Sequence, residues 1–202
     1  MAKLSRIRTQ NTENILAAAE QEFVLHGFKG TSMQSIADRA GLPKANIHYY
    51  FGNKEGLYRS LLEHILEKWM KLLDGLTEGE PKDILEHYIR SKVRLSFSEP
   101  NASKIFAMEI IQGAPFLKDY LEGPLLAWVK EKSDLINSWI WQKKMPEIDP
   151  VQLIITIWAN TQHYVDFSVQ VLAITTQTSY SEAQQKRIED FVASSILKII
   201  GF

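Results

Sequence analysis

The sequence of 202 residues contains no cysteine. Disulfides, a thiolate nucleophile and thiolate metal sites are therefore excluded, and the composition fits a reducing cytoplasm. No uninterrupted apolar run is long enough to span a bilayer, and the basic start at Lys3, Arg6 and Arg8 has no apolar run behind it. We therefore expect a cytoplasmic protein with neither a signal peptide nor a membrane segment. Strand signals of useful length are missing too, so we predict an all-α fold.

Motifs of catalysis are also missing. The five histidines include no pair spaced as in zinc enzymes. The sequence has no glycine-rich phosphate loop, no nucleophile elbow and no dinucleotide fingerprint. His163 lies near Asp166, but no nucleophile accompanies them. We predict that the chain is not an enzyme and uses no cofactor or metal; an enzyme of unrecognised type would have to turn over a bound small molecule.

The net charge of −1 says little, but the distribution of charge says more. Residues 1–55 carry seven basic and five acidic side chains, giving +2, while the rest of the chain carries 16 and 19, giving −3. This sign fits a DNA-reading head on a neutral-to-acidic body. With 45% hydrophobic residues, the chain can bury a substantial core in one or two domains.

The most informative stretch is a pair of short predicted helices in the N-terminal third. Thr31 is expected to cap the first helix in a capping box with Gln34, and Gly41 to end it. Pro43 suits the first turn of a second helix, which runs to about Tyr50. Two short helices joined by a glycine turn form a helix-turn-helix, whose second helix enters the major groove of DNA. A helical hairpin that only packs is the alternative.

The pair stands in a longer ordered string of residues. Its members are Gly27-Phe28, Thr31-Ser32, Ile36-Ala37, Ala40-Gly41, Tyr49-Tyr50-Phe51, Asn53-Lys54-Glu55 and Leu57-Tyr58. This string resembles the N-terminal domain of the TetR/AcrR family of bacterial transcriptional regulators. The resemblance implies a three-helix DNA-binding head over residues 1–53 and a helical ligand-binding and dimerisation domain over residues 54–202.

The second helix carries side chains that suit base reading. Asn46 can pair with adenine, and Lys44 can donate to guanine or phosphate, with His48 beside them. Other residues would position the protein on phosphates, among them Lys54, for which the family resemblance implies that role. The full predicted DNA-binding set is Arg8, Thr31, Ser32, Gln34, Lys44, Ala45, Asn46, His48, Tyr49, Tyr50 and Lys54.

Two features limit this prediction. Residues 1–10 are expected to be a flexible basic arm that contacts phosphate or enters a minor groove, and a merely disordered terminus is an equal alternative. Pro43 and the pair Ala45-Asn46 differ from the residues that many relatives have there. An operator sequence therefore cannot be transferred from any relative.

Further helices are predicted along the rest of the chain. Their approximate ranges are 12–26, 53–74 with Asn53 as cap, 82–98, 102–112, 117–141 with a bend near Gly123-Pro124, 150–173 with Asp149 as cap, and 181–200, with a polar break at Gly75–Pro81. From Pro150 to Ser181 the one charged residue is Asp166, so we expect much of this surface to be covered. We predict a homodimer through a four-helix bundle of helices 150–173 and 181–200, as the family resemblance implies; burial within one chain is the alternative.

Polar residues on apolar helix faces predict a ligand site. Trp158, Gln162 and Asp166 recur every four residues on one face. An indole can stack on a flat heterocycle, and a glutamine amide complements the N–H and C=O of a lactam. The predicted ligand-binding set is Trp69, Phe106, Met108, Trp158, Thr161, Gln162 and Asp166. The alternatives are bonding of Gln162, His163 and Asp166 across the dimer interface and, for the aromatic residues and Met108, ordinary core packing.

The body resembles one subgroup of the family. The residues that carry the likeness are Asn101-Ala102-Ser103 with Phe106, Met108-Glu109, Gly113-Ala114-Pro115, Glu131-Lys132-Ser133, Ile148-Asp149-Pro150 and the run from Trp158 to Phe167. They resemble the RutR-like repressors of pyrimidine utilisation, which implies a regulator released from operator DNA by uracil or thymine. A repressor of unrelated apolar or aromatic ligands, and a dimeric ligand-binding protein without DNA binding, are the alternatives. The sequence gives neither operator, regulated genes nor the sign of regulation.

Overall fold

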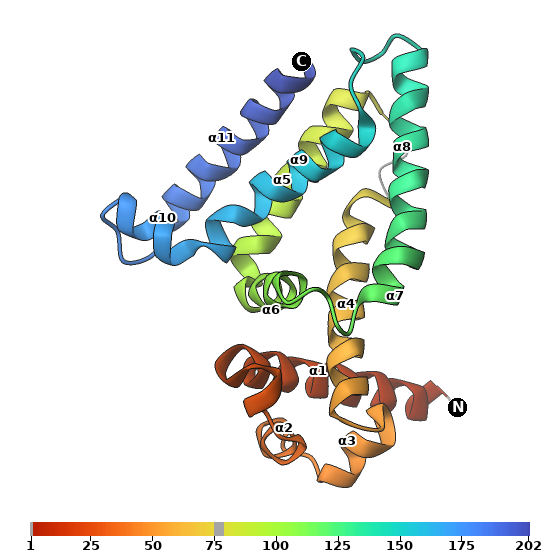
Figure 1. The fold of residues 1–202 in the computed structure, drawn as a ribbon, viewed down its shortest axis with the longest axis vertical. Helices are drawn as coiled ribbons and strands as arrows, with labels where there is room; N and C mark the ends of the chain where they lie inside the picture. Colours follow the sequence, from red (N-terminus) through yellow and green to blue (C-terminus); the bar gives the residue numbers. More distant parts are fainter. Residues whose placement is uncertain (1, 75–78) are drawn as a thin grey trace. The chain divides into compact units, whose positions relative to one another are not determined.

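The computed structural model describes the backbone of residues 2–74 and 79–202, and side chains within these ranges except those of residues 2–5 and 7. All regular structure in these ranges is helical, which confirms the all-α prediction (Figure 1). The helices are α1 (Ala2–Gly30), α2 (Met33–Ala40), α3 (Lys44–Phe51), α4 (Lys54–Asp74), α5 (Pro81–Ser98), α6 (Pro100–Ile111), α7 (Lys118–Tyr120), the π-helical turn η1 (Leu121–Leu125), α8 (Leu126–Trp141), α9 (Pro150–Asp166), α10 (Ser168–Ile174) and α11 (Glu182–Ile200). Most of the predicted break at Gly75–Pro81 lies outside the described residues.

The chain packs as two compact units. The first comprises residues 1–66 and 104–119, and the second residues 67–103 and 120–202. Helices α4 and α6 each contribute residues to both units. The predicted boundary after residue 53 does not coincide with the division into these two units, and it stays a prediction.

The first unit is built around the faces that the sequence indicated. Ile15, Ala19 and Phe23 of α1 are fully or almost fully buried, as are Ile36 of α2 and Ile47 of α3. Figure 1 shows α2 and α3 packed on the same side of α1. Because these apolar positions meet, the two short helices are held by tertiary contacts rather than by their own helix propensity.

The predicted flexible arm is wrong for the backbone of residues 2–10, which is helical. Helix α1 begins at Ala2 rather than near Thr12. No glycine or proline interrupts the chain before Gly27, so nothing in the local sequence stops the helix from extending toward the terminus. The predicted stop is confirmed, because Gly27 leaves helical geometry at a φ of 65°, which glycine adopts readily.

The N-cap of α2 is shifted by one residue from the prediction. Ser32, not Thr31, caps the helix: its hydroxyl accepts a hydrogen bond from the Ser35 amide at 2.9 Å. Ser35 also takes the place predicted for Gln34 in the capping box. Thr31 is instead buried, and its hydroxyl contacts the Gly27 carbonyl at 2.8 Å. The stop after α2 is confirmed, with Gly41 in the left-handed conformation.

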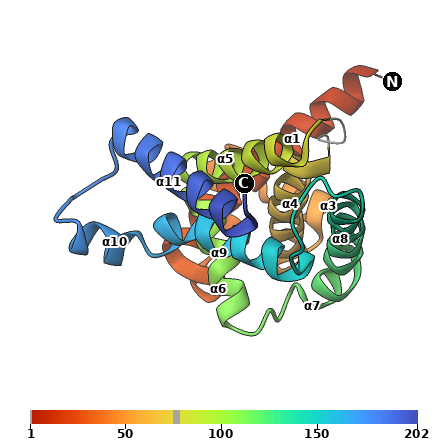
Figure 2. The same ribbon diagram turned by 90° about the horizontal axis from the view of Figure 1, so that it is seen from above.

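The second unit is a helical body in which α5 packs against α9 and α11 (Figure 2). Tyr88 and Ile89 of α5, Ile157 of α9 and Ile196 of α11 belong to its core. Asp149 caps α9 as predicted, its carboxylate accepting from the Val151 amide at 2.9 Å. No helix in the described ranges is both long and apolar enough to cross a membrane.

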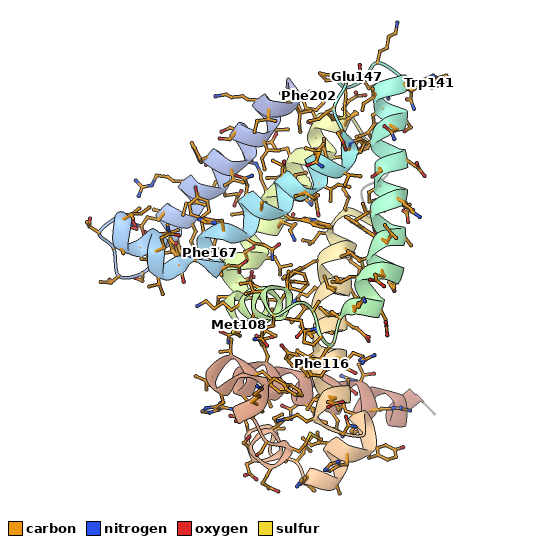
Figure 3. The ribbon with its side chains drawn as sticks, viewed as in Figure 1. Met108, Phe116, Trp141, Glu147, Phe167 and Phe202 are labelled. Carbon is orange, nitrogen blue, oxygen red and sulfur yellow. The ribbon has the colours of Figure 1, made fainter. Side chains whose placement is uncertain are left out.

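Two irregularities interrupt the long helices of the body. The predicted bend near Gly123-Pro124 is confirmed as η1, since a proline removes a backbone donor. The predicted helix 150–173 is interrupted at Phe167, where α9 ends and α10 begins (Figure 3). Phe167 is half-exposed there, and α10 exposes Val169 and Ile174.

Candidate DNA-binding head and effector site

One face of α3 is exposed and polar. Lys44, Ala45, His48 and Tyr49 are all exposed, and their spacing places them on one side of the helix. Asn46 is half-buried, while Ile47 is fully buried and fastens the opposite side to the head. Helix α3 therefore presents donors and acceptors to solvent from a fixed support.

Side-chain hydrogen bonds hold α3 and its flanking turns in place. The imidazole Nδ1 of His48 bonds the Gly52 carbonyl at 2.7 Å, which leaves its Nε2 free to face outward. Asn11 of α1 donates to the Tyr50 hydroxyl at 3.3 Å. Asn14 donates to the Ala40 carbonyl at the end of α2 at 2.9 Å. The recognition helix is thus tied to α1 directly and through α2.

Lys54 has a structural task that the sequence did not indicate. Its Nζ donates to the carbonyls of Phe28 at 2.8 Å and Thr31 at 2.9 Å, and it lies 4.6 Å from the centre of the Phe28 ring. An ammonium has three donors, so one remains for a phosphate. The phosphate contact of Lys54 stays a prediction.

Other predicted DNA-binding residues lie at the start of α2 and on α1. Ser32 and Gln34 are exposed, and Gln34 donates to the Asp38 carboxylate at 2.8 Å. Arg8 is exposed on the regular part of α1 rather than on a flexible arm. The Thr31 side chain is 3% exposed, so its hydroxyl is not available to a phosphate. This corrects the predicted contact, because the hydroxyl bonds carbonyls inside the head.

An aromatic cluster fills the first unit beside α1. The rings of Phe28 and Phe116 are 4.5 Å apart, and those of Phe23 and Tyr58 are 4.7 Å apart. The buried Glu109 carboxylate accepts from the Phe116 amide at 2.7 Å; burial and this carboxylate together raise the pKa of Tyr58. A cavity of about 530 Å³ adjoins the cluster, and Met108, which is labelled in Figure 3, is one of its lining residues.

The predicted ligand-binding residues divide between the two units. Phe106 and Met108 belong to the first unit, and Met108 lines the cavity in that unit. The other five belong to the body: Trp69, Trp158, Thr161, Gln162 and Asp166. Of these body residues, Trp69 lies on α4 and the other four lie on α9; they are called the body cluster below.

Two polar side chains of this cluster bond the Ser103 hydroxyl of α6. The Asp166 carboxylate accepts a short hydrogen bond from the Ser103 hydroxyl. The Gln162 amide donates to the same hydroxyl at 3.4 Å. Thr161 is buried, and its hydroxyl donates to the Ile157 carbonyl at 2.7 Å, so it serves the helix itself. Gln162 and Asp166 thus have a partner within the chain, whereas His163 is exposed and stacks on Phe167 at 4.9 Å.

Trp158 is oriented by a second set of contacts. Its indole N–H donates to the Tyr88 hydroxyl at 3.1 Å, and its ring stacks on Trp128 at 6.1 Å. The Trp128 indole donates in turn to Asp74 at 2.8 Å, a carboxylate that also pairs with the buried Lys132 at 2.8 Å. Burial opposes the charge of Lys132, but its hydrogen bonds to Asp74 and Glu131 outweigh that effect and raise its pKa.

The sequence interpretation missed a further member, Lys92 of α5. Lys92 is 3% exposed, and its Nζ lies 4.6 Å from the centre of the Trp69 ring. Burial lowers the pKa of Lys92 to about 7, and the charge of the Asp166 carboxylate acts in the opposite direction. One signal was available: Tyr88, Lys92 and Ser96 recur every four residues within a helix face that is otherwise apolar.

Apolar side chains remain exposed along the two helices predicted for dimerisation. On α9 these are Val151 and Ile155, and on α11 they are Phe191 and Ile199. On each helix the two residues are a multiple of four apart, so they form a stripe. Such stripes on neighbouring helices provide an apolar surface beside the core of the body.

Family models match both parts of the chain. The model described as "Bacterial regulatory proteins, tetR family" matches residues 15–61, and the model described as "YcdC-like protein, C-terminal region" matches residues 62–202. The chain is also 44% identical over 181 residues to the HTH-type transcriptional regulator RutR of Escherichia coli K12, covering 89% of this chain and 85% of that protein. These matches confirm the resemblance seen in the head and the body.

Solved structures share the fold at low sequence identity. The TetR family regulator PfmR of Thermus thermophilus superposes with a TM-score of 0.72 at 16% identity, covering 91% of this chain and 97% of that one. AibR, solved with isovaleryl coenzyme A and operator DNA, gives a TM-score of 0.68 at 16% identity over 92% and 97% of the two chains. The relatives are transcriptional regulators rather than enzymes. The chain therefore belongs to the TetR family and is a RutR-like, ligand-responsive transcriptional regulator.

Proposed function

We propose that the chain is a homodimeric repressor that leaves its operator when it binds a pyrimidine, uracil or thymine. The observation that carries the DNA-binding half is the exposed face of α3, with Lys44, His48 and Tyr49 outward and Ile47 inward. Donors on such a face can reach base edges in a major groove. Two copies would read half-sites separated by about one helical turn, roughly 34–36 Å.

The proposed dimer uses the apolar stripes of α9 and α11. Val151, Ile155, Phe191 and Ile199 would be covered by the same residues of a second copy, as in an isologous interface. Sedimentation at micromolar concentration tests this directly. A dimer is expected, and a monomer at all concentrations would contradict the proposal.

The proposed effector site lies in the body cluster. Trp69 and Trp158 supply flat apolar faces, and Gln162 supplies an amide that can pair with a lactam. Two arguments support a pyrimidine as the effector. The chain is similar to RutR, and the resemblance to that subgroup implies such a ligand. The predicted residues also suit the flat ring and the lactam groups of a pyrimidine. A ligand that binds one state of the repressor better shifts the population toward it, by no more than its difference in affinity for the two states.

Fluorescence anisotropy with DNA from upstream of its own gene tests both halves. We expect tight binding without ligand and release by uracil or thymine. If the protein binds this DNA no more tightly than unrelated DNA at the same salt concentration, the DNA-reading role is rejected. The alternative, a ligand-binding protein that does not recognise an operator, would then hold. If other small molecules release the protein from DNA but uracil and thymine do not, the pyrimidine effector is rejected and the repressor function is retained.

Asn46 is the proposed base-reading residue. Asn46→Ala should weaken operator binding by roughly 1–3 kcal/mol and relax the preference at one base position. A randomised operator library measures that preference. Asn137→Ala, an exposed asparagine of α8, is the matched control and should leave binding intact. An unchanged base preference in Asn46→Ala would exclude the role.

A further inference from the structure

Lys92 is a buried base whose donors the protein leaves unmet. Its side chain is 3% exposed, and its Nζ donates no hydrogen bond and forms no ion pair within the described residues. The face of Trp69, 4.6 Å from Nζ, compensates in part through its negative π surface. A buried ammonium still requires acceptors for its three protons, so an oxygen from outside the chain is expected beside it.

The fold fixes where that oxygen would lie. On α5, the Tyr88 hydroxyl accepts from Trp158, and the Ser96 hydroxyl bonds the Thr161 carbonyl at 3.0 Å. Lys92 lies midway between these two contact points, one helical turn from each. Its side chain therefore belongs to the same α5–α9 contact as the proposed effector residues of α9.

The charges around Lys92 leave its position unneutralised. On α9, the charge of the Asp166 carboxylate acts on Lys92, and the same carboxylate accepts a hydrogen bond from Ser103. On α11, the buried Glu189 is engaged by Arg94 at 2.7 Å and by Arg90. On α4, the neighbouring group is the uncharged ring of Trp69.

We propose that Lys92 is an effector-binding residue that donates from Nζ to a carbonyl oxygen of a planar cyclic imide or lactam. This inference deepens the proposed function and rests on it. A pyrimidine-2,4-dione has two carbonyls, so Gln162 can pair with one edge while Lys92 takes the other oxygen. Cytosine carries an amino group in place of one carbonyl, and two donors facing each other are repulsive. Lys92 would thus select uracil and thymine over cytosine.

A consequence is that effector binding takes up a proton. Since burial lowers the pKa of Lys92 to about 7, much of the free protein carries a neutral amine above that pH. A carbonyl acceptor favours the charged form and raises the pKa in the complex. Affinity for uracil should therefore fall as pH rises, by up to roughly thirtyfold from pH 6 to pH 8.5 if the raised pKa lies well above that range.

Titration calorimetry with uracil, thymine and cytosine tests the proposal. Wild type should bind uracil and thymine, prefer them to cytosine, and show proton uptake as a dependence of the heat on the ionisation enthalpy of the buffer. Lys92→Met should bind uracil roughly tenfold or more weakly, lose most of the preference over cytosine, and take up no proton. Lys82→Met removes an exposed lysine of the same helix and is the matched control, which should retain proton uptake and preference.

The outcomes separate the two proposals. Wild type that binds uracil without proton uptake, with Lys92→Met binding it equally well, overturns the role of Lys92 and leaves the pyrimidine effector standing. Wild type that binds neither uracil nor thymine rejects the effector and the role of Lys92 with it. If Lys92→Met does not fold, as circular dichroism would reveal, proton uptake by wild type decides alone: uptake supports the proposal and its absence contradicts it.

Discussion

Two lysines of the body, Lys92 and Lys132, are buried to the same extent, 3% exposed each, yet their surroundings are opposite. Lys132 pairs with Asp74 at 2.8 Å and with Glu131 at 2.7 Å, and its pKa is raised. Lys92 lies over an indole face, the Asp166 carboxylate acts on it through its charge, and burial lowers its pKa to about 7. The same residue type with the same exposed fraction thus has its charged form favoured in one place and disfavoured in the other.

The contrast indicates where a function is built. A paired buried charge needs no explanation beyond the fold, whereas a buried base without such a partner is a candidate for a functional site. The head provides a third case, since the half-buried Lys54 is satisfied by two backbone carbonyls. Substitution of each lysine by methionine, which preserves bulk without charge, sharpens the comparison.

The largest effect is expected from Lys92→Met. Replacing an unmet buried base by an apolar side chain should stabilise the protein at pH 7 by roughly 1–4 kcal/mol. The unfolded chain binds a proton at Lys92 below pH 10.5, while the folded chain releases it above about 7. The free energy of unfolding of wild type should therefore increase as pH rises from 7 to 10.5, because the cost of burying this lysine disappears. The variant should not show this increase. Urea unfolding at fixed protein concentration measures both, and a destabilised variant would contradict the account.

Lys132→Met should change the free energy of unfolding in the opposite direction. It removes the ammonium from Asp74 and Glu131 and should destabilise the protein by roughly 1–3 kcal/mol. Because folding raises the pKa of Lys132, its contribution is present below pH 10.5 and is lost as pH rises through the folded value. The same unfolding series measures it. Equal behaviour of the two methionine variants would remove the distinction between the lysines.

The effect of Lys54→Met on the free energy of unfolding should be smaller. Losing two hydrogen bonds to the carbonyls of Phe28 and Thr31 should cost roughly 0.5–1.5 kcal/mol of stability. If the third donor contacts phosphate, the variant should also lower the salt slope of DNA binding by about one. An unchanged slope would assign Lys54 to the fold alone.

The smallest effect is expected from Asp166→Asn. The amide oxygen can still accept from Ser103, but the charge that favours protonated Lys92 disappears, so the pKa of Lys92 should fall further below 7. Nitrogen NMR of the lysine side chains, with Lys92→Met for assignment, measures this titration. A rise in that pKa would show that Asp166 does not act on Lys92.

The sequence allowed correct prediction of those helix ends and bends that depend on a single local residue. The stops at Gly27 and Gly41, the cap Asp149 and the bend at Pro124 each depend on one residue, and the structure confirms them. The choice between Thr31 and Ser32 as cap could not be made in this way. Either hydroxyl can cap, and what decides is that the fold buries Thr31 against carbonyls of α1.

The effector cluster was predicted in part for the same reason. Trp158, Gln162 and Asp166 stand out because polar residues interrupt an apolar run of one helix. The partners Ser103 and Tyr88 come from other helices, and no spacing along α9 could indicate them. Lys92 was missed because a lysine on a helix reads as solvated until packing buries it.

Release of operator DNA by uracil, followed at pH 6 and pH 8.5 in wild type and Lys92→Met, tests the account most directly. We predict that wild type needs roughly ten times more uracil or more for half-release at pH 8.5 than at pH 6, given a pKa near 7 for the free lysine. The variant should need more uracil at pH 6 and show little change with pH. Half-release at the same uracil concentration in both proteins at both pH values would contradict the claim that the unmet lysine marks the effector site.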